Sequence, residues 1–269
     1  MTSTTDDRIE ELIHGAARLR REYEVPTGFQ RAPFFEVQTD RFALLAVDTG
    51  VVKRVDDEQL VWLQQALARA RGKTIVAVLG HPFYASGMDL RPGHEDFQKL
   101  YDLLRAHDVA VVMAGDTHDL EHYLEPTATG RVIQHVVNGG GGAYLSFGSA
   151  LAWPAEPALG NWAYYPSSAA AIAKIDAQTP WWKRPAWWWT RSFGAWPFSA
   201  EWLSAAFDYN TAPFFQSFVE VRVEPGRLTM HPYGPHGRLR WSDLSTSSGA
   251  RPAGVGADDP VEWSVETQR

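Results

Sequence analysis

The chain has 269 residues, of which 45% are hydrophobic and 21% charged, a composition typical of a soluble globular protein long enough to bury a full core. Its net charge of -7 argues against nucleic acid as the main partner, because phosphate backbones select basic surfaces. The absence of cysteine excludes disulfides and thiolate ligands, so a metal ion can be held only by His, Asp, Glu, Asn or water.

The N-terminal residues carry no apolar core of the kind that a signal peptide needs. No run of about 18 apolar residues occurs in the chain, so we expect no membrane span and a cytoplasmic location. Residues 6–23 predict a helix, because apolar side chains recur there at helical spacing. Residues 1–30 are therefore expected to form an N-terminal helix and a linker.

The region from residue 42 to 147 alternates between apolar runs and amphipathic segments. Strands are predicted over 34–38, 42–50, 73–84, 109–119 and 131–147, and helices over 57–72 and 95–107. This alternation predicts a layered α/β sheet. A hairpin is predicted over 214–233, with Pro225 and Gly226 near its turn.

Polar side chains stand where several of the predicted strands end. They are His81, Asp116, His118 and Asn138. Functional groups of layered α/β sheets lie beyond the carboxyl ends of the strands. Imidazole and carboxylate ligands without sulfur suit Mn, Fe or Zn. The alternative is that these residues cap strands and bond to loop backbone.

Residues close to these strand ends also allow two interpretations. Asp119 either orients His118 or forms a turn. His122 is expected at the surface or in support of a ligand, and His135 in a structural role. The "NGGGG" run over 138–142 either cradles an anion or permits close approach of backbone to a neighbouring site, and the second interpretation is favoured.

Taken in order, five segments resemble a known enzyme family. They are "LAVDTG", "DDEQLVWLQQAL", "VAVLGHPFY", "VVMAGDTHDLEHYLE" and "HVVNGGGGAYLSF". Their order resembles the second half of the calcineurin-like metallophosphoesterases, and the purple acid phosphatases are the nearest branch. The resemblance covers residues 34–147, and the hairpin over 214–233 corresponds to the closing strands.

The resemblance implies an α/β/β/α sandwich and hydrolysis of a phosphomonoester or phosphodiester by a hydroxide that two divalent metal ions activate. His81 corresponds to the lone histidine of the second metal site. Asp116 stands at the first histidine of the family's Gly-His-x-His motif, and His118 at the second. The resemblance thus implies His81, Asp116 and His118 as metal ligands and Mn, Fe or Zn as cofactors.

The chain departs from the family in three places. Asp116 replaces a histidine, and His81 directly precedes Pro82, where the family has one residue between. The motifs Asp-x-His, Gly-Asp-x-x-Asp and Gly-Asn-His-Asp/Glu are absent. We therefore expect residues 31–244 to be a partial domain that lacks the N-terminal half, a fragment with an incomplete two-metal site.

Two hypotheses about function follow. The first is a metal-dependent phosphoesterase that acts on a small phosphoester and is incomplete in this chain. The second is a non-catalytic remnant or binding module that needs a partner chain. An open apolar sheet edge would require self-association or a complementing N-terminal half.

The last third of the chain is less regular. Seven of the 12 tryptophans fall between Trp181 and Trp202, within a Trp-rich insertion at about 150–215. This segment could contact a membrane interface, wall a substrate cleft or pack as a lid against the sheet, and the packed lid is favoured. Residues 245–269 are rich in Ser, Gly, Ala, Pro and acidic residues and are expected to be a disordered tail.

Overall fold

The computed structural model describes residues 14, 15, 18, 21, 22, 33–142, 145–193, 195–199, 202, 203, 206, 208, 209 and 211–267. The chain divides into two units, Met1–Pro33 and Phe34–Arg269. In the first unit the five described positions from 14 to 22 are helical. The remainder of the helix expected over 6–23 lies outside the described residues.

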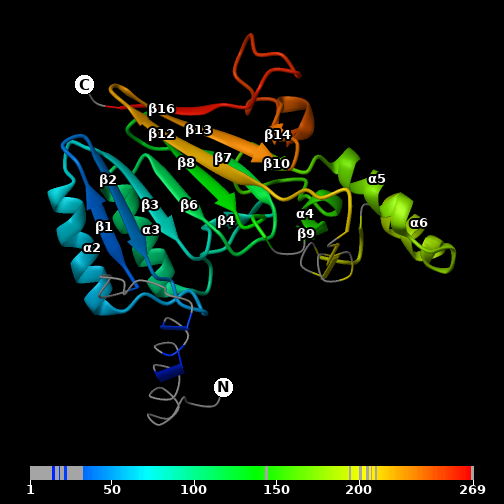
Figure 1. Ribbon diagram of the computed structural model, residues 1–269, viewed down its shortest axis with the longest axis horizontal. Helices are drawn as coiled ribbons and strands as arrows, with labels where there is room; N and C mark the ends of the chain where they lie inside the picture. Colours follow the sequence, from blue (N-terminus) through cyan, green and yellow to red (C-terminus); the bar gives the residue numbers. More distant parts are fainter. Residues whose placement is uncertain are drawn as a thin grey trace. The chain divides into compact units, whose positions relative to one another are not determined.

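An eight-stranded mixed sheet forms the centre of the second unit (Figure 1). Its order is β1 (Phe35–Gln38), β2 (Phe42–Val47), β3 (Thr74–Leu79), β6 (Val111–Ala114), β8 (Val132–Asn138), β7 (Leu120–Pro126), β10 (Asn161–Tyr165) and β15 (Ser245–Thr246). Strands β2, β3, β6 and β8 run parallel, so their carboxyl ends meet at one edge, the rim. The flanking strands β1, β7, β10 and β15 pair antiparallel.

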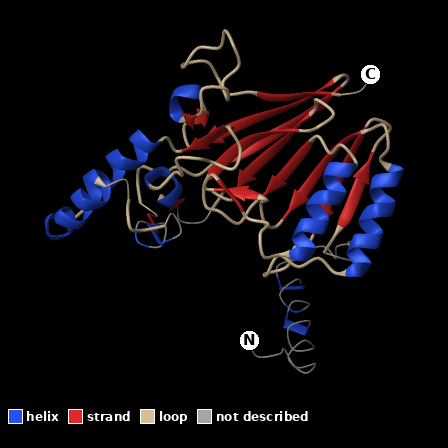
Figure 2. Cartoon of the chain, turned by 180° about the vertical axis from the view of Figure 1, so that it is seen from behind, coloured by secondary structure: helices blue, strands red, loops and turns tan. Residues whose placement is uncertain are grey.

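Two helices cover one face of this sheet, as both views show (Figures 1 and 2). Helix α2 (Asp57–Arg69) begins where the Asp56 carboxylate accepts the Gln59 backbone N–H at 2.7 Å, a typical N-cap. Helix α3 (Glu95–Ala106) buries one apolar stripe, formed by Phe97, Leu100, Tyr101 and Leu104. Both helices pack into one apolar cluster with β2, β3 and β6.

A second sheet covers the opposite face. It contains β12 (Phe218–Glu224), β13 (Arg227–Gly234), β14 (Gly237–Arg238) and β16 (Trp263–Glu266). The predicted hairpin is confirmed as β12 and β13, and Gly226 adopts the positive φ of +86° that the turn between them requires. A second apolar cluster joins the two sheets. The layered α/β architecture expected from the sequence is thereby confirmed.

Two parts of residues 245–267 pair in the sheets, β15 in the central sheet and β16 in the second one, in contrast to the disordered tail expected from their composition. Ser245 pairs with Tyr164 on β10, and Trp263 pairs with Met230 on β13. Trp263 is only 4% exposed and packs in the cluster between the sheets. The few apolar residues of this segment fall where they can be buried, and this outweighs a composition typical of disorder.

The Trp-rich insertion also contributes to the main sheet, because β10 pairs with β7. The remaining elements lie outside the two large sheets. They are β4 (Tyr84–Ala85), β5 (Met88–Asp89), β9 (Leu145–Ser146), α4 (Gly148–Leu151), α5 (Ser168–Gln178), α6 (Arg184–Ser192), β11 (Asp208–Tyr209) and the 3₁₀ helices η1 (Trp181–Lys183) and η2 (Trp241–Asp243). Trp187 on α6 is buried, whereas the other described tryptophans of η1 and α6 are exposed, so the packed lid favoured from the sequence is wrong for those exposed side chains.

Candidate functional site

The end of β2 is held in place by the first turn of α2. The buried Gln59 side chain accepts the Asp48 backbone N–H at 2.6 Å and donates to the Asp48 carbonyl at 2.8 Å. The Asp48 carboxylate in turn accepts the Gly50 N–H at 2.9 Å. These bonds place Thr49, which is fully buried, at the rim.

Thr49 orients His81 at the end of the neighbouring strand β3. Its Oγ1 lies 2.8 Å from His81 Nδ1 and accepts the His81 backbone N–H at 3.1 Å. Gly80 makes room for this contact, since a Cβ there would lie 2.8 Å from Thr49 Oγ1. Because the hydroxyl engages Nδ1, Nε2 is the ring nitrogen that can serve a ligand. Thr49 was missed at the sequence level, because no spacing rule marks a hydroxyl as the support of a histidine.

Asp116 occupies a strained turn directly after β6. Its φ is +74°, and the Thr117 N–H donates to the Gly115 carbonyl at 3.0 Å. This combination describes the rarer form of the γ-turn, in which the central residue is strained. Such backbone conformations cost about 1–3 kcal/mol and concentrate at functional sites. The turn brings Asp116 Oδ1 to 3.9 Å from His81 Nε2.

The structure therefore brings together two of the three expected ligands, His81 and Asp116. His81 is 13% and Asp116 48% exposed in their side chains, so the pair is reachable from solvent. His118 is half-buried and lies close to Asp119. Over the described residues, no three His, Asp or Glu side chains gather as a metal-ligand set. The donors at the rim thus do not fit a complete two-metal centre, and the ligand assignment of the three residues stays a prediction.

Two buried carboxylates lie on β7 and the residue before it. The Asp119 carboxylate accepts the Ser149 hydroxyl at 3.1 Å. Glu121 is fully buried and accepts the Ser86 backbone N–H with both oxygens, at 3.0 and 2.9 Å, together with the Tyr123 hydroxyl. Burial raises the pKa of both carboxyls, and the neighbouring Asp119 raises the pKa of Glu121 further. Because two negative charges in one buried site repel each other, we expect one of the two carboxyls to keep its proton.

The glycine run at the end of β8 allows close approach of backbone to a neighbouring loop, which confirms the favoured interpretation of "NGGGG". A Cβ on Gly139 would lie 1.9 Å from the Thr117 carbonyl oxygen. The Gly139 N–H donates to the Asp119 carbonyl at 3.2 Å, and the Asn138 side chain accepts the Ser217 hydroxyl at 3.0 Å. The glycine run thus packs directly under the loop that carries Asp116.

We expect Gly139→Ala to distort this loop and to lower the free energy of unfolding by about 1–3 kcal/mol, the usual cost of overpacking. The clash involves backbone atoms, which cannot move aside as the end of a side chain can. Urea denaturation measures the change. Gly142→Ala is the matched control, because no atom lies within 4 Å of the added Cβ. Equal stability of the two variants would contradict the close approach.

The expectation for His122 is wrong, because this residue lies on β7 and is buried. The sequence placed His122 at the surface or beside a ligand, whereas it is 2% exposed and stacks on Trp263. Its Nε2 lies 3.0 Å from Gln134 Oε1, and burial lowers its pKa to about 4. His135 has the expected structural role, because its Nε2 lies 2.8 Å from a Glu125 oxygen in the core.

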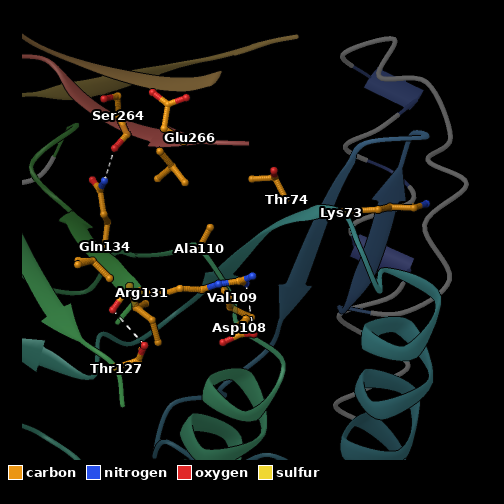
Figure 3. Close-up of a pocket in the computed structure, with 13 residues that line it drawn as sticks. Lys73, Thr74, Asp108, Val109, Ala110, Thr127, Arg131, Gln134, Ser264 and Glu266 are labelled. Carbon is orange, nitrogen blue, oxygen red and sulfur yellow. Dashed lines mark hydrogen bonds and ion pairs between the residues drawn. The ribbon is translucent and has the colours of Figure 1, made fainter. Parts of the chain in front are cut away.

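A cavity of about 350 Å³ lies at the opposite end of the strands (Figure 3). Several of its polar groups are already engaged: Arg131 pairs with Asp108 at 3.2 Å, and Gln134 donates to the Ser264 carbonyl at 2.6 Å. Ligands of α/β sheets bind beyond the carboxyl ends of the strands. The rim around His81 and Asp116 is therefore the stronger candidate.

No protein-family model and no curated protein matches the chain. Among solved structures it is similar to a purple acid phosphatase from yellow lupin (Lupinus luteus) seeds, with a TM-score of 0.44 and 13% identity over 90% of this chain and 34% of that chain. It is also similar to GAP50, the anchor in the inner membrane complex of Plasmodium, with a TM-score of 0.33 and 17% identity over 50% of this chain and 45% of that one. The chain thus spans about a third of the length of the phosphatase, and membership of the metallophosphoesterases stays a prediction from the sequence motifs.

Proposed function

We propose that this chain is a metallophosphoesterase-type domain that contributes part of a phosphoester-hydrolysing site and does not turn over phosphoesters by itself. The convergence of His81 Nε2 and Asp116 Oδ1 at 3.9 Å carries the proposal. An imidazole and a carboxylate at this separation can share one divalent cation. The ordered motifs that resemble the family support the same conclusion.

Each residue of this pair has a role that its surroundings favour. Thr49 holds the His81 ring and leaves Nε2 toward Asp116, as partners of ligating histidines do. The strained turn holds the Asp116 carboxylate at the rim. A divalent ion bound there would supply Lewis-acid chemistry to a phosphoryl oxygen.

The incompleteness of the site follows from the donor set. In the ranges that the structure describes, His81 and Asp116 have no third His, Asp or Glu in a metal-ligand group. We propose that the remaining donors come from a second copy or from a complementing chain. A site built in this way binds metal weakly alone and becomes competent only in the assembly.

Isothermal titration calorimetry with Mn²⁺ tests the proposal. We expect weak binding of one ion to the wild type and a loss of at least about tenfold in affinity for His81→Ala or Asp116→Asn. His94→Ala and Asp40→Asn are matched controls, because both residues are exposed and lie outside the rim. Turnover of p-nitrophenyl phosphate and bis-p-nitrophenyl phosphate should stay at background for every variant.

Two results would contradict the proposal in different ways. Turnover by the wild type alone that His118→Ala abolishes would show that the site is complete. Absence of Mn²⁺ binding, or binding that both rim variants retain, would remove the metal role. That second result would favour the non-catalytic binding module, which the missing third ligand among the described residues already supports.

A further inference from the structure

A cluster of exposed aromatic side chains, here called the tryptophan patch, occupies η1, α6 and the turn after α6. Its members and exposed fractions are Trp181 (80%), Trp182 (61%), Trp188 (64%), Trp189 (43%), Phe193 (49%) and Trp196 (67%). Soluble proteins rarely expose contiguous apolar patches of this kind unless the patch has a binding role. Neither the fold nor the proposed phosphoesterase site uses these side chains.

Helix α6 presents the patch because its other face is anchored to α5. Trp187 is 5% exposed, and its indole Nε1 donates to Asp176 Oδ1 at 2.6 Å. Arg191 donates to the other oxygen of Asp176 at 2.9 Å, and Thr190 is buried on the same side. Both ribbon views show α5 and α6 extending away from the two sheets (Figures 1 and 2). The orientation of α6 is therefore set by its contacts, and the remaining indoles face outward.

The charge of this segment is opposite to that of the whole chain. Residues 177–200 contain Lys183, Arg184 and Arg191 and no Asp or Glu, although the net charge of the chain is -7. The Lys183 ammonium lies 5.0 Å above the Trp182 ring. Arg191 is neutralised by Asp176, whereas Lys183 and Arg184 have no acidic partner within the described residues. A partner that complements this surface must combine apolar and anionic groups.

We propose that the tryptophan patch docks on the surface of an anionic lipid bilayer. Indole rings settle at the level of the headgroups, where one edge is apolar and the other is hydrated. Lysine and arginine beside them are attracted to anionic headgroups while their stems stay in apolar surroundings. In the part of the chain that the structure describes, no helix has the length and apolar character needed to cross a bilayer, so the contact is interfacial.

The same charges disfavour a second copy of the chain as the occupant. Two patches meeting face to face would bring Lys183 and Arg184 of both copies together, and like charges in a desolvated interface repel. Lipid phosphates and carboxylates offer the opposite charge. The cationic groups therefore distinguish the bilayer from self-association.

Vesicle flotation with the full chain tests the proposal. One set of vesicles contains phosphatidylcholine alone, and the other an equimolar mixture with phosphatidylserine. We expect the wild type to float with the anionic vesicles, less so as salt is added, and not with the neutral ones. The double variant Trp181→Ala/Trp188→Ala should bind the anionic vesicles at least about tenfold more weakly.

Matched variants distinguish binding through the tryptophan patch from binding through any exposed aromatic ring or any cationic side chain. Phe35→Ala removes an exposed aromatic ring on β1 and should bind vesicles as the wild type does. Arg184→Glu should weaken binding, whereas Arg71→Glu makes the same charge change at an exposed position after α2 and should not. Far-UV circular dichroism verifies that each variant is folded.

Three results would overturn the proposal. The first is absence of wild-type binding to either vesicle. The second is equal binding to both vesicles that Arg184→Glu leaves unchanged. The third is a wild-type dimer in gel filtration that Trp181→Ala/Trp188→Ala converts to a monomer, which would assign the tryptophan patch to a second copy.

Discussion

Replacement of Trp263 by alanine is expected to lower the free energy of unfolding by about 3–5 kcal/mol, the range for large aromatic side chains in a core. Trp263 is 4% exposed, and its ring stacks on that of His122 with centroids 4.1 Å apart and planes within 10°. It also packs in the apolar cluster that joins the two sheets. The loss should appear as a lower urea midpoint with an unchanged slope.

Two variants refine this test. Trp181→Ala removes the same side chain from a position that is 80% exposed and should leave the midpoint almost unchanged. Trp263→Phe keeps a ring against His122 and removes an indole N–H that has no hydrogen-bond partner within the described residues, so its cost should be smaller. If Trp263→Ala were as stable as Trp181→Ala, residues 245–267 would not contribute to the core. The segment would then be the disordered tail that its composition indicates.

Glu121→Gln is expected to make the protein more stable than the wild type at pH 8 and to flatten the dependence of its stability on pH. Burial raises the pKa of Glu121 well above its usual value of 4.5, and Asp119 raises it further. The folded chain therefore keeps a proton that the unfolded chain loses. Stability falls as pH rises above the unfolded pKa, and continues to fall until pH passes the folded pKa.

Glutamine resembles the protonated carboxyl and removes this loss. Its amide oxygen can still accept the Ser86 N–H. Glu121→Ala, by contrast, leaves the Ser86 N–H and the Tyr123 hydroxyl without their acceptor and should cost about 1–3 kcal/mol for each group. Urea midpoints at pH 5 and pH 8 separate the two effects.

Glu125→Gln is the matched control, because Glu125 lies four residues further along β7 and its pKa moves in the opposite direction. Burial raises the pKa of Glu125, but hydrogen bonds from His135 and Tyr101 outweigh burial and lower it. Ionised Glu125 therefore stabilises the fold above the unfolded pKa, and this stability is lost as pH falls. We expect Glu125→Gln to destabilise at pH 8. The same sign for both glutamine variants would contradict the raised pKa of Glu121.

Local patterns predicted the elements that carry their own periodicity. Helix α3 buries Phe97, Leu100 and Leu104 as its helical spacing indicates, and β2, β3 and β6 follow continuous apolar runs. Strand β7 escaped prediction because Glu121, His122 and Glu125 read as polar surface in isolation. Their partners lie on other elements: Ser86 before β5, Gln134 on β8 and Tyr101 on α3.

The sequence by itself determined that His81 and Asp116 end neighbouring strands, because apolar runs stop there and parallel strands present their carboxyl ends together. Only the tertiary structure decided how these residues meet. The Thr49 contact and the strained turn at Asp116 depend on atoms that are distant in sequence or on a backbone angle that no pattern encodes. The exposure of the tryptophan patch also depends on tertiary contacts. The bonds of Trp187 and Arg191 to Asp176 determine which face of α6 is buried.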